Sequence, residues 1–309
     1  MAAIVGLGGV CLDRLAILPR MPGWDEVEHI SSSATQLGGM VATAMVAAAR
    51  LGESAEMIGG VGNDDAGRYA LETLKREGVI TQNMQVIDDE ATAFSFVLVH
   101  QETGQRTILH QRGVQAGEEL PPATFDLAGV RFLHLDGYWF RSALRAAQQA
   151  KAHGVTVTLD PSTRLLHADA EELFYCVDYF MPGIAFVEQF MAEREPFRAA
   201  KTLLKYGGKA VILTNGAEGV YVCAPDDEFH IPAFRVPVVD TTGAGDVFHG
   251  AFVAGLQKGY ALRQAVTFAS AVAALKCTKL GGQAGIPTFQ ETLEFLERQG
   301  FAVRHFQSA

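Results

Sequence analysis

A string of seven residues, DTTGAGD at positions 240–246, places small residues and a carboxylate directly ahead of an apolar run. This pattern predicts a loop that feeds the N-terminus of a helix, where several backbone N–H groups lack a partner within the helix. Those donors and the helix dipole together form a cradle for an anion. Asp246 falls in the first turn, so its carboxylate could take a proton from an alcohol held beside the cradle. A base next to an anion hole suits phosphoryl transfer, whose catalysis depends mainly on positioning and charge stabilisation.

The alternative for this string is an ordinary helix start in which Asp246 only complements the helix dipole. For Gly-Ala-Gly-Asp alone, that structural interpretation would be the better one. The whole string favours the catalytic interpretation, in which the amides of Gly243, Ala244 and Gly245 form the anion hole.

Three other segments could contact a ligand, and each also has a purely structural interpretation. Gly38-Gly39 precedes an Ala-rich run, where glycine allows close approach of either a ligand or a neighbouring strand. Asp13 follows the first predicted strand, at the edge where open α/β sheets bind ligands, although a lone loop aspartate is often a turn residue. The segment TNGAEG at 214–219 has the chemistry of a hairpin turn.

The sequence lacks the commonest nucleotide-binding motifs. Residues 6–11, GLGGVC, end in cysteine where the dinucleotide-binding fingerprint requires glycine, and no P-loop is present. The signature strings of protein kinases, serine hydrolases and HExxH metalloproteases are absent as well.

Composition narrows the partners of this 309-residue chain. The formal net charge is -10 and no run of Lys or Arg occurs, which argues against nucleic acid or an anionic membrane as a partner. The four cysteines have neither CxxC nor zinc-site spacing. The N-terminus lacks a basic segment and no apolar run is long enough to span a membrane, so we expect a cytoplasmic protein with reduced thiols.

The elements that must position these residues alternate between strands and helices. Strands are predicted at 2–8, 54–61, 130–135, 155–160, 177–181, 210–214 and 219–224, and helices at 39–51, 64–77, 141–153, 197–206, 244–258, 261–277 and 288–299. Such alternation is typical of an α/β fold with a doubly wound, mostly parallel sheet and helices on both faces. Residues 14–37 and 92–112 are instead β-rich with turn signals, and we expect an antiparallel flap there. The chain, 1–309, is then one domain with a small β-sheet lid.

Three strings together resemble the ribokinase-like, phosphofructokinase-B-type family of carbohydrate kinases. They are Gly38-Gly39 with AAARLG at 47–52, GGVGND at 59–64 with Gly67, and 240–246 with Phe248 and Gly250. The resemblance covers essentially the whole chain. It implies a ribokinase-like fold and an ATP- and Mg²⁺-dependent kinase that phosphorylates a hydroxyl of a ketose or related sugar. In some members the lid also pairs two subunits, which implies a homodimer.

The resemblance also implies roles for individual residues. Asp246 would be the general base, in front of the anion hole described above. Asp13, Gly38, Gly39, Thr43 and Asp136 would contact the sugar, and Thr214, Gly216, Gly219 and Ser270 would border the nucleotide. A loop that often holds K⁺, mainly through carbonyl oxygens, would include Asp240, Thr242, Lys279, Gly281 and Gly285.

Two positions depart from the family pattern. Thr43 stands where an asparagine often contacts the sugar, and threonine reaches less far. Residues 183–186, GIAF, stand where an Asn-x-x-Glu element tied to magnesium is expected. Magnesium would then be held by phosphates, water and other groups, with Glu188 as a nearby candidate.

One branch of the family, the bacterial 6-deoxy-6-sulfofructose kinases, is similar in further strings. These are DVFHG at 246–250, VAALKCT at 272–278 and GIP at 285–287. A sulfonate needs basic groups, and the candidates by location are Arg106, His110, Arg112, Arg141 and His29. For each of them, a solvated surface charge is the better explanation.

Two other functions stay open on the sequence alone. A nucleoside kinase of the same fold would need an aromatic pocket, which Phe94, Phe96, Trp139 and Phe140 could line unless they are core residues. A non-catalytic sugar or nucleotide binder would explain the missing Asn-x-x-Glu element, but a sensor has no need of a base such as Asp246.

Overall fold

The body of the protein is built on an eight-stranded sheet, in a computed structural model that describes residues 2–120, 126–161, 163–167 and 169–306. The strand order is β14-β13-β12-β11-β10-β9-β1-β4. Pairing is parallel from β12 to β4 and antiparallel for β12–β13 and β13–β14. The strands are β1 (Ile4–Leu7), β4 (Ala55–Ile58), β9 (Phe132–Leu135), β10 (Thr156–Leu159), β11 (Tyr179–Phe180), β12 (Ala210–Thr214), β13 (Val220–Ala224) and β14 (Asp227–Ile231). The predicted mostly parallel sheet is confirmed.

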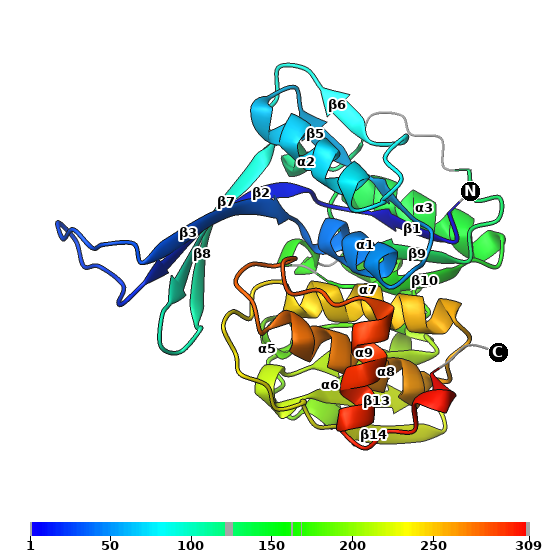
Figure 1. Cartoon of the computed structure of the whole chain (residues 1–309). Helices are drawn as coiled ribbons and strands as arrows, with labels where there is room; N and C mark the ends of the chain where they lie inside the picture. The colour runs from blue at the N-terminus through cyan, green and yellow to red at the C-terminus, as the bar shows by residue number, and fades with distance from the viewer. Residues whose placement is uncertain (1, 121–125, 162, 168, 307–309) are drawn as a thin grey trace.

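Helices cover both faces of this sheet, as Figure 1 shows. They are α1 (Met40–Arg50), α2 (Asp65–Arg76), α3 (Phe140–Ala152), α4 (Ala170–Phe174), α5 (Ile184–Met191), α6 (Pro196–Leu203), α7 (Ala244–Gln257), α8 (Leu262–Lys276) and α9 (Phe289–Arg298). One apolar core lies under α1, α7, α8 and α9, and a second under α3, α4 and α6. Within the described part of the chain, no helix is long and apolar enough to cross a membrane.

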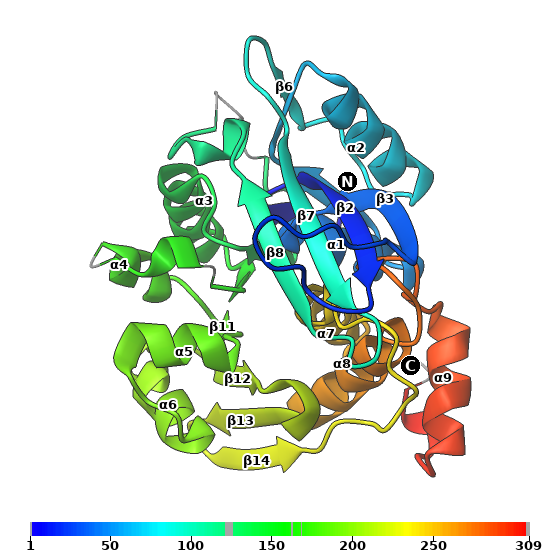
Figure 2. The ribbon, with the colours of Figure 1, turned by 90° about the vertical axis from the view of Figure 1, so that its left-hand side faces the viewer.

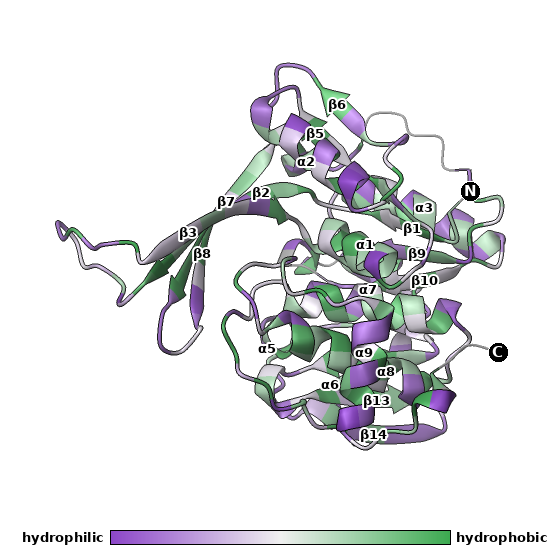
Figure 3. Ribbon diagram, viewed as in Figure 1, coloured by the Kyte–Doolittle hydropathy of each residue, from purple (hydrophilic) through white to green (hydrophobic). Residues whose placement is uncertain are grey.

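Helix α7 is held at its place by its small residues and its apolar faces. All residues from Val247 to Gly255 are buried. A Cβ at Gly250 would overlap the carbonyl of Ala44, so glycine lets α7 cross α1 in direct backbone contact. The outer helix α9 differs, because its hydrophilic and hydrophobic patches alternate in Figure 3, as on a helix with one face in solvent.

A separate four-stranded sheet, the flap, projects from the body (Figures 1 and 2). Its order is β3 (Ser32–Gly38), β2 (Cys11–Leu18), β7 (Ala93–His100) and β8 (Arg106–Gln111). The predicted antiparallel pairing is right for the two hairpins but wrong for the central pair, since β2 and β7 run parallel. The reason is that the chain returns to the body between them, so both strands leave it in the same direction.

Other differences from the predicted elements are local. The predicted strand 54–61 divides into β4 and β5 (Gly60–Gly62), and β5 pairs with β6 (Gln85–Ile87) in a third sheet. The break falls at Gly59, where a Cβ would lie 2.7 Å from the carbonyl oxygen of Gly8. Strand β14 and helices α4 and α5 were not predicted, and α5 begins within the 183–186 string. The hairpin turn between β12 and β13 is confirmed.

Candidate active site

The cradle at the start of α7 has the geometry that the 240–246 string predicts. Gly243 caps the helix in the left-handed region at φ 71°, where glycine is favoured, and a Cβ there would lie 3.0 Å from Gly282 Cα. The N–H of Ala244 donates to the Thr241 carbonyl at 3.2 Å. Among the described residues, no acceptor lies within hydrogen-bond distance of the N–H groups of Gly243, Gly245 or Asp246. Gly243, Gly245 and Asp246 therefore have free N–H groups at the start of α7, whereas the N–H of Ala244 is bonded to Thr241, and an anion hole formed by these amides stays a prediction.

Asp246 stands at this cradle with its carboxylate open. It lies in the first turn of α7 and is partly buried. No donor among the described residues reaches its oxygens, whereas both oxygens of Asp136 and of Asp240 accept backbone N–H bonds. A carboxylate that no protein donor occupies can accept the proton of an incoming alcohol.

Burial raises the pKa of Asp246 to about 7, and the charge of Asp160 adds to the rise. His249 and Arg106 oppose it with their positive charges. A base poised near neutral pH combines a large ionised fraction with appreciable proton affinity. Several ionisable groups interact with Asp246 through their charges. They are Cys11 and Asp13 of β2, Arg106 of β8, Asp160 after β10, His249 of α7 and Lys276 of α8.

Asp160 and His249 form a buried pair that the sequence analysis did not assign. Nδ1 of His249 lies 2.8 Å from Oδ2 of Asp160. Burial opposes the charge on the imidazole, but the neighbouring carboxylate outweighs it and raises the pKa of His249. Nearby His134 is neutral, because burial and the charge of His249 lower its pKa to about 3. Two signals could have revealed the pair: Asp160 ends a parallel strand, and His249 lies one turn after Asp246.

The predicted sugar end lies where β2 and β3 leave the body. Asp13 is 8% exposed, burial raises its pKa, and it accepts a bond from the Cys11 thiol at 3.2 Å. A Cβ at Gly38 would overlap the Asp13 carboxylate, and one at Gly39 (φ 104°) would overlap the carbonyl of Gly9. Both glycines thus pack closely against the protein itself, and a contact with the sugar stays a prediction for them.

Asp136 and Thr43 lie deeper than a direct sugar contact would require. Asp136 is 0% exposed, and its oxygens accept from the N–H groups of Gly9 (2.8 Å) and Tyr138 (2.9 Å). It fixes the turn after β1 through its bond from Gly9, and burial raises its pKa to about 7. Thr43 is 2% exposed, and its hydroxyl accepts from Gln283 at 3.3 Å. As placed, both support the site, and direct contact with a sugar stays a prediction for them.

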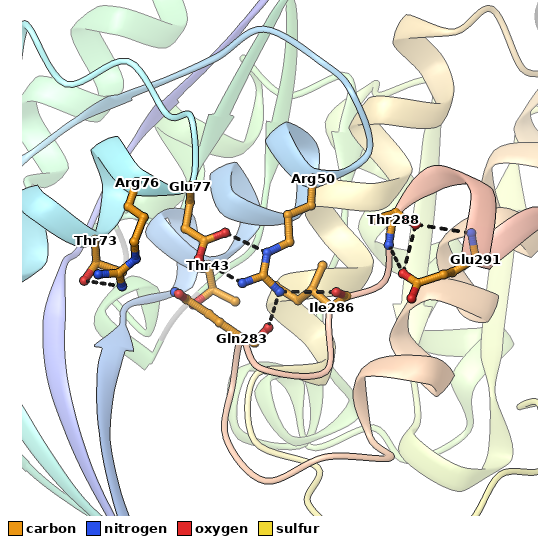
Figure 4. A network of polar contacts seen from close by, with 9 residues as sticks. All are labelled: Thr43, Arg50, Thr73, Arg76, Glu77, Gln283, Ile286, Thr288 and Glu291. Atoms are coloured by element: carbon orange, nitrogen blue, oxygen red, sulfur yellow. Dashed lines mark hydrogen bonds and ion pairs between the residues drawn. The ribbon is translucent and has the colours of Figure 1, made fainter.

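An arginine anchors the loop that carries Gln283, as Figure 4 shows. Arg50 of α1 donates to the carbonyls of Gln283 (2.7 Å) and Ile286 (3.2 Å) and pairs with Glu77 at 2.7 Å. This loop also contains Gly282, the neighbour of Gly243. Helix α1 thus fixes the loop that packs against Gly243 at the start of the cradle.

The predicted nucleotide residues lie along the β12–β13 hairpin and α8. Thr214 ends β12 at the carboxyl edge, the edge at which Asp136 and Asp160 also emerge from β9 and β10. Gly216 (φ 50°) faces open space, and Gly219 (φ 95°) is confined by the carbonyl of Ile231. Ser270 is 8% exposed and donates to Val266 O within its own helix at 2.9 Å. The hairpin therefore shares the edge with the cradle, while the Ser270 hydroxyl is engaged within α8.

Comparison with known proteins identifies the family. The model of the pfkB family carbohydrate kinases matches residues 4–289. This chain belongs to that family. It is a phosphotransferase with the ribokinase-like fold, and the expected fold class and enzyme class are confirmed.

Individual relatives of this kinase cover nearly its whole length. Ribokinase of Haemophilus influenzae is 31% identical, over 94% of this chain and 97% of that protein. The ATP-dependent ribose-1-phosphate kinase of Halopiger xanaduensis is 29% identical, over 97% and 99%. The crystal structure of ribokinase from Thermotoga maritima is 28% identical, has a TM-score of 0.82 and covers 96% of the kinase and 100% of that chain.

The flap of the kinase touches the loops on both sides of the cradle. Nη1 of Arg106 on β8 donates to Oγ1 of Thr241 at 2.9 Å. Gln36 of β3 packs against Gly281, where a Cβ would overlap its amide. Of the basic residues predicted above, Arg106 is thus the one with a hydrogen bond to the segment 240–246 in the described part of the chain.

The remaining basic and aromatic candidates have other surroundings. His110 bonds Ser95 and Gln115, and Arg141 pairs with Glu118 at 2.9 Å. His29 and Arg112 are exposed. Trp139 is 1% exposed and belongs to the core under α3, so it does not line an aromatic nucleoside pocket.

The loop predicted to hold K⁺ already contains a positive charge. Asp240 is 0% exposed, and its carbonyl accepts from the ammonium of buried Lys276 at 2.9 Å. Its carboxylate accepts from the N–H groups of Thr242 (2.8 Å) and Gly281 (2.7 Å). Lys279 is exposed. A K⁺ ion would need oxygen atoms directed at it, and this carbonyl is directed at an ammonium, so the residues present do not fit the ion.

Among the described residues, no group of three or more His, Cys, Asp or Glu side chains is placed to hold a metal ion such as magnesium. Glu188, the candidate near 183–186, is paired with Arg194 at 3.6 Å. Mg²⁺ is commonly bound through phosphates and water with few protein ligands. This kinase therefore fits a magnesium ion that arrives with its nucleotide.

Proposed function

We propose that this kinase transfers the γ-phosphoryl group of ATP to a hydroxyl of a sugar, with Asp246 as the general base. The observation that carries the proposal is the unoccupied carboxylate of Asp246 beside three unpaired N–H groups at the start of α7. Two relatives support the chemistry, since one is a ribokinase and the other an ATP-dependent ribose-1-phosphate kinase by name.

In this mechanism the acceptor hydroxyl lies between Asp246 and the γ-phosphoryl group. Asp246 takes the hydroxyl proton as the oxygen attacks the γ-phosphorus and the bond from that phosphorus to ADP breaks. Its pKa of about 7 lets it work near neutral pH. The N–H groups of Gly243 and Gly245 donate to the phosphoryl oxygens as charge shifts during transfer. Mg²⁺, when bound with the nucleotide, supplies further neutralisation of phosphate charge.

The sugar would lie between Asp13 and the cradle, under the flap. We propose that residues 14–37 and 92–112 act as the lid of a single domain spanning 1–309. The contacts of Arg106 and Gln36 with the loops that flank the cradle would hold this lid closed and exclude water from the reacting phosphate. Nucleotide would enter from the β12–β13 hairpin, with Thr214, Gly216 and Gly219 at its border.

An ADP-release assay with a panel of acceptors tests this function. The panel contains ketohexoses, ribose, ribose 1-phosphate, 6-deoxy-6-sulfofructose and nucleosides. We expect turnover with at least one sugar and none with nucleosides, because two of the four aromatic candidates do not form a pocket: Trp139 is buried in the core and Phe96 is 41% exposed on the flap. Turnover confined to nucleosides, or ATP binding with no product from any acceptor, would overturn the proposal.

We also propose that the flap pairs two copies of the kinase. Its loop and strands carry most of the large apolar side chains that are strongly exposed, namely Met21, Trp24, Val27, Ile30, Phe96, Ile108 and Leu109. Trp24 is 99% exposed and Val27 85%. Seven exposed large apolar side chains on one small sheet and its loop are unusual for a monomer, and a second flap offers a matching surface.

A further inference from the structure

Lys276 carries a charge that the proposed reaction has not used. It is the last residue of α8 and is 0% exposed, although lysine is almost never fully buried unless its charge is balanced. Burial lowers the pKa of Lys276, because the charged ammonium loses its hydration and the neutral amine loses much less. Burial of this charge lowers the stability of the fold, so we expect the ammonium to serve a function at this position.

The ammonium lies directly behind the segment that leads into the cradle. Nζ donates to the carbonyl of Asp240 at 2.9 Å, two residues before Thr242. The N–H groups of Val239 and Asp240 donate in return to the carbonyl of Cys277, the residue after Lys276. The end of α8 and the start of the 240–246 string are thus joined by three hydrogen bonds, one of them charge-assisted.

Asp240 connects Lys276 to both walls of the cradle, which are the segments around Gly243 and Gly282. Its carboxylate accepts from the N–H of Thr242, next to Gly243, and from the N–H of Gly281, next to Gly282. Gly243 and Gly282 are in contact across the cradle. A positive charge at the Asp240 carbonyl therefore stabilises the buried carboxylate that fixes the positions of both walls.

We propose that the Lys276 ammonium is the built-in monovalent cation of this phosphate cradle, so that the kinase works without K⁺ or any other added monovalent cation. The inference rests on the proposed role of the cradle. An ammonium and a K⁺ ion each carry one positive charge, but the ammonium donates hydrogen bonds and is tethered, so no ion has to be captured from solution. The C-terminal end of α8, with its partial negative charge, favours a cation at this point.

A purely structural lysine would hold the same contacts but would not be replaceable by a free ion. The two roles differ in their response to salts. Steady-state rates of the wild-type kinase should be measured in tetramethylammonium buffer with and without added KCl, at constant ionic strength. We expect the two rates to agree within about twofold, since the charge is already in place. A rate that depends on K⁺ with saturation would overturn the proposal.

Two substitutions separate charge from packing. Lys276→Ala removes the ammonium and leaves room for an ion, whereas Lys276→Met removes the charge but keeps most of the volume. We expect both to lose roughly tenfold or more in kcat in tetramethylammonium buffer, as for loss of a preorganised charge near the reacting phosphate. K⁺ or NH₄⁺ should restore much of the rate to Lys276→Ala and little to Lys276→Met. Lys75→Ala, an exposed lysine in the last turn of α2, is the matched control.

Thermal melting supplies a readout that needs no substrate. Added K⁺ or NH₄⁺ should raise the Tm of Lys276→Ala in a concentration-dependent way, and should leave the Tm of the wild type and of Lys276→Met unchanged beyond the general effect of salt. If Lys276→Ala keeps a wild-type rate without cation, or if no ion restores its rate and Tm, the ammonium is not a cation substitute. If Lys276→Ala does not fold, the wild-type salt comparison still decides the question. The melting result holds even if the sugar or the base has been assigned wrongly.

Discussion

The cradle and the flap differ in how their polar and apolar groups are placed. Around the cradle, ionisable side chains are buried and individually bonded, such as Asp136, Asp240 and Lys276. The flap has only a small core of its own, Leu15, Val97 and Val99, and exposes much of its apolar surface. The comparison teaches that the cradle is held by many buried contacts, whereas the flap, our proposed lid, has few buried contacts that a movement would break.

The largest effect is expected from Asp246→Asn, which leaves the shape of the cradle but removes its base. We expect kcat to fall by roughly three orders of magnitude, with nucleotide affinity close to that of the wild type. The measurement is steady-state turnover together with calorimetric ATP binding. Asp65→Asn, the same change in the first turn of α2, is the control and should leave turnover unchanged.

The same variant has a second signature, in stability. An aspartate whose pKa is raised from 3.8 to about 7 on folding costs stability as the pH rises through that interval, because the unfolded chain has already released its proton. The asparagine side chain of the variant does not titrate. The Tm of Asp246→Asn should therefore exceed that of the wild type at pH 8, with little difference at about pH 4. Equal Tm values at pH 8 would contradict the buried, raised-pKa assignment.

Arg106 tests the contact between flap and cradle. Arg106→Ala removes the bond to Thr241 and a positive charge beside the phosphates. We expect kcat/KM for ATP to fall about tenfold, and the loss to shrink at high salt, because the interaction is exposed and screened. Arg68→Ala on α2 should change neither value. An unchanged kcat/KM would mean that the flap closes without contributing to nucleotide handling.

His249 tests how the charges around the cradle set the pKa of Asp246. Turnover should decline as the pH falls through about 7, because Asp246 then takes up a proton and cannot act as a base. The charge of His249 lowers the pKa of Asp246, so His249→Gln should move this acid limb toward higher pH, by about one unit. The comparison uses pH profiles of kcat/KM with the same nucleotide, whose own ionisation then cancels. If the acid limb of the pH profile does not move, the Asp160–His249 pair does not influence the pKa of Asp246.

The smallest kinetic effect is expected at the tip of the flap. Trp24→Ser with Val27→Ser removes the two most exposed apolar side chains there. Light scattering after size-exclusion chromatography should report a dimer for the wild type and a monomer for the variant, with little change in kcat. Tyr175→Ser, at a side chain 54% exposed on the body, should leave the dimer intact. A monomeric wild type would refute the proposed pairing.

The sequence predicted most of the body, for a physical reason visible in its strands and helices. Alternating buried strands and Ala-rich or amphipathic helices, such as α1 and α9, have strong local patterns. The parallel pairing of β2 with β7 had no local signal, because it depends on where a distant chain segment returns. Strand β14 was missed since a five-residue strand after a turn resembles the loop itself.

The candidate site was predictable only where a motif carried it. The string 240–246 indicated Asp246 and the glycines of the cradle, a strand end indicated Asp13, and the family resemblance indicated Asp136. The pairing of His249 with Asp160, and of Lys276 with Asp240, joins residues 89 and 36 positions apart. The end of β10 and the place of His249 one turn after Asp246 could mark Asp160 and His249 as candidates, but which residues become partners follows from the packing of α7 and α8. For Thr43, the family position suggested a contact that Gln283 occupies in the structure.

The most direct test of Asp246 as the base is a crystal structure with an accepted sugar and a non-hydrolysable ATP analogue bound. We expect the reacting hydroxyl within about 2.6–3.2 Å of the Asp246 carboxylate and in line with the γ-phosphoryl group. The N–H groups of Gly243 and Gly245 should face the phosphoryl oxygens. A hydroxyl bonded to Asp13 or Asp160 instead, with Asp246 out of reach, would contradict the account.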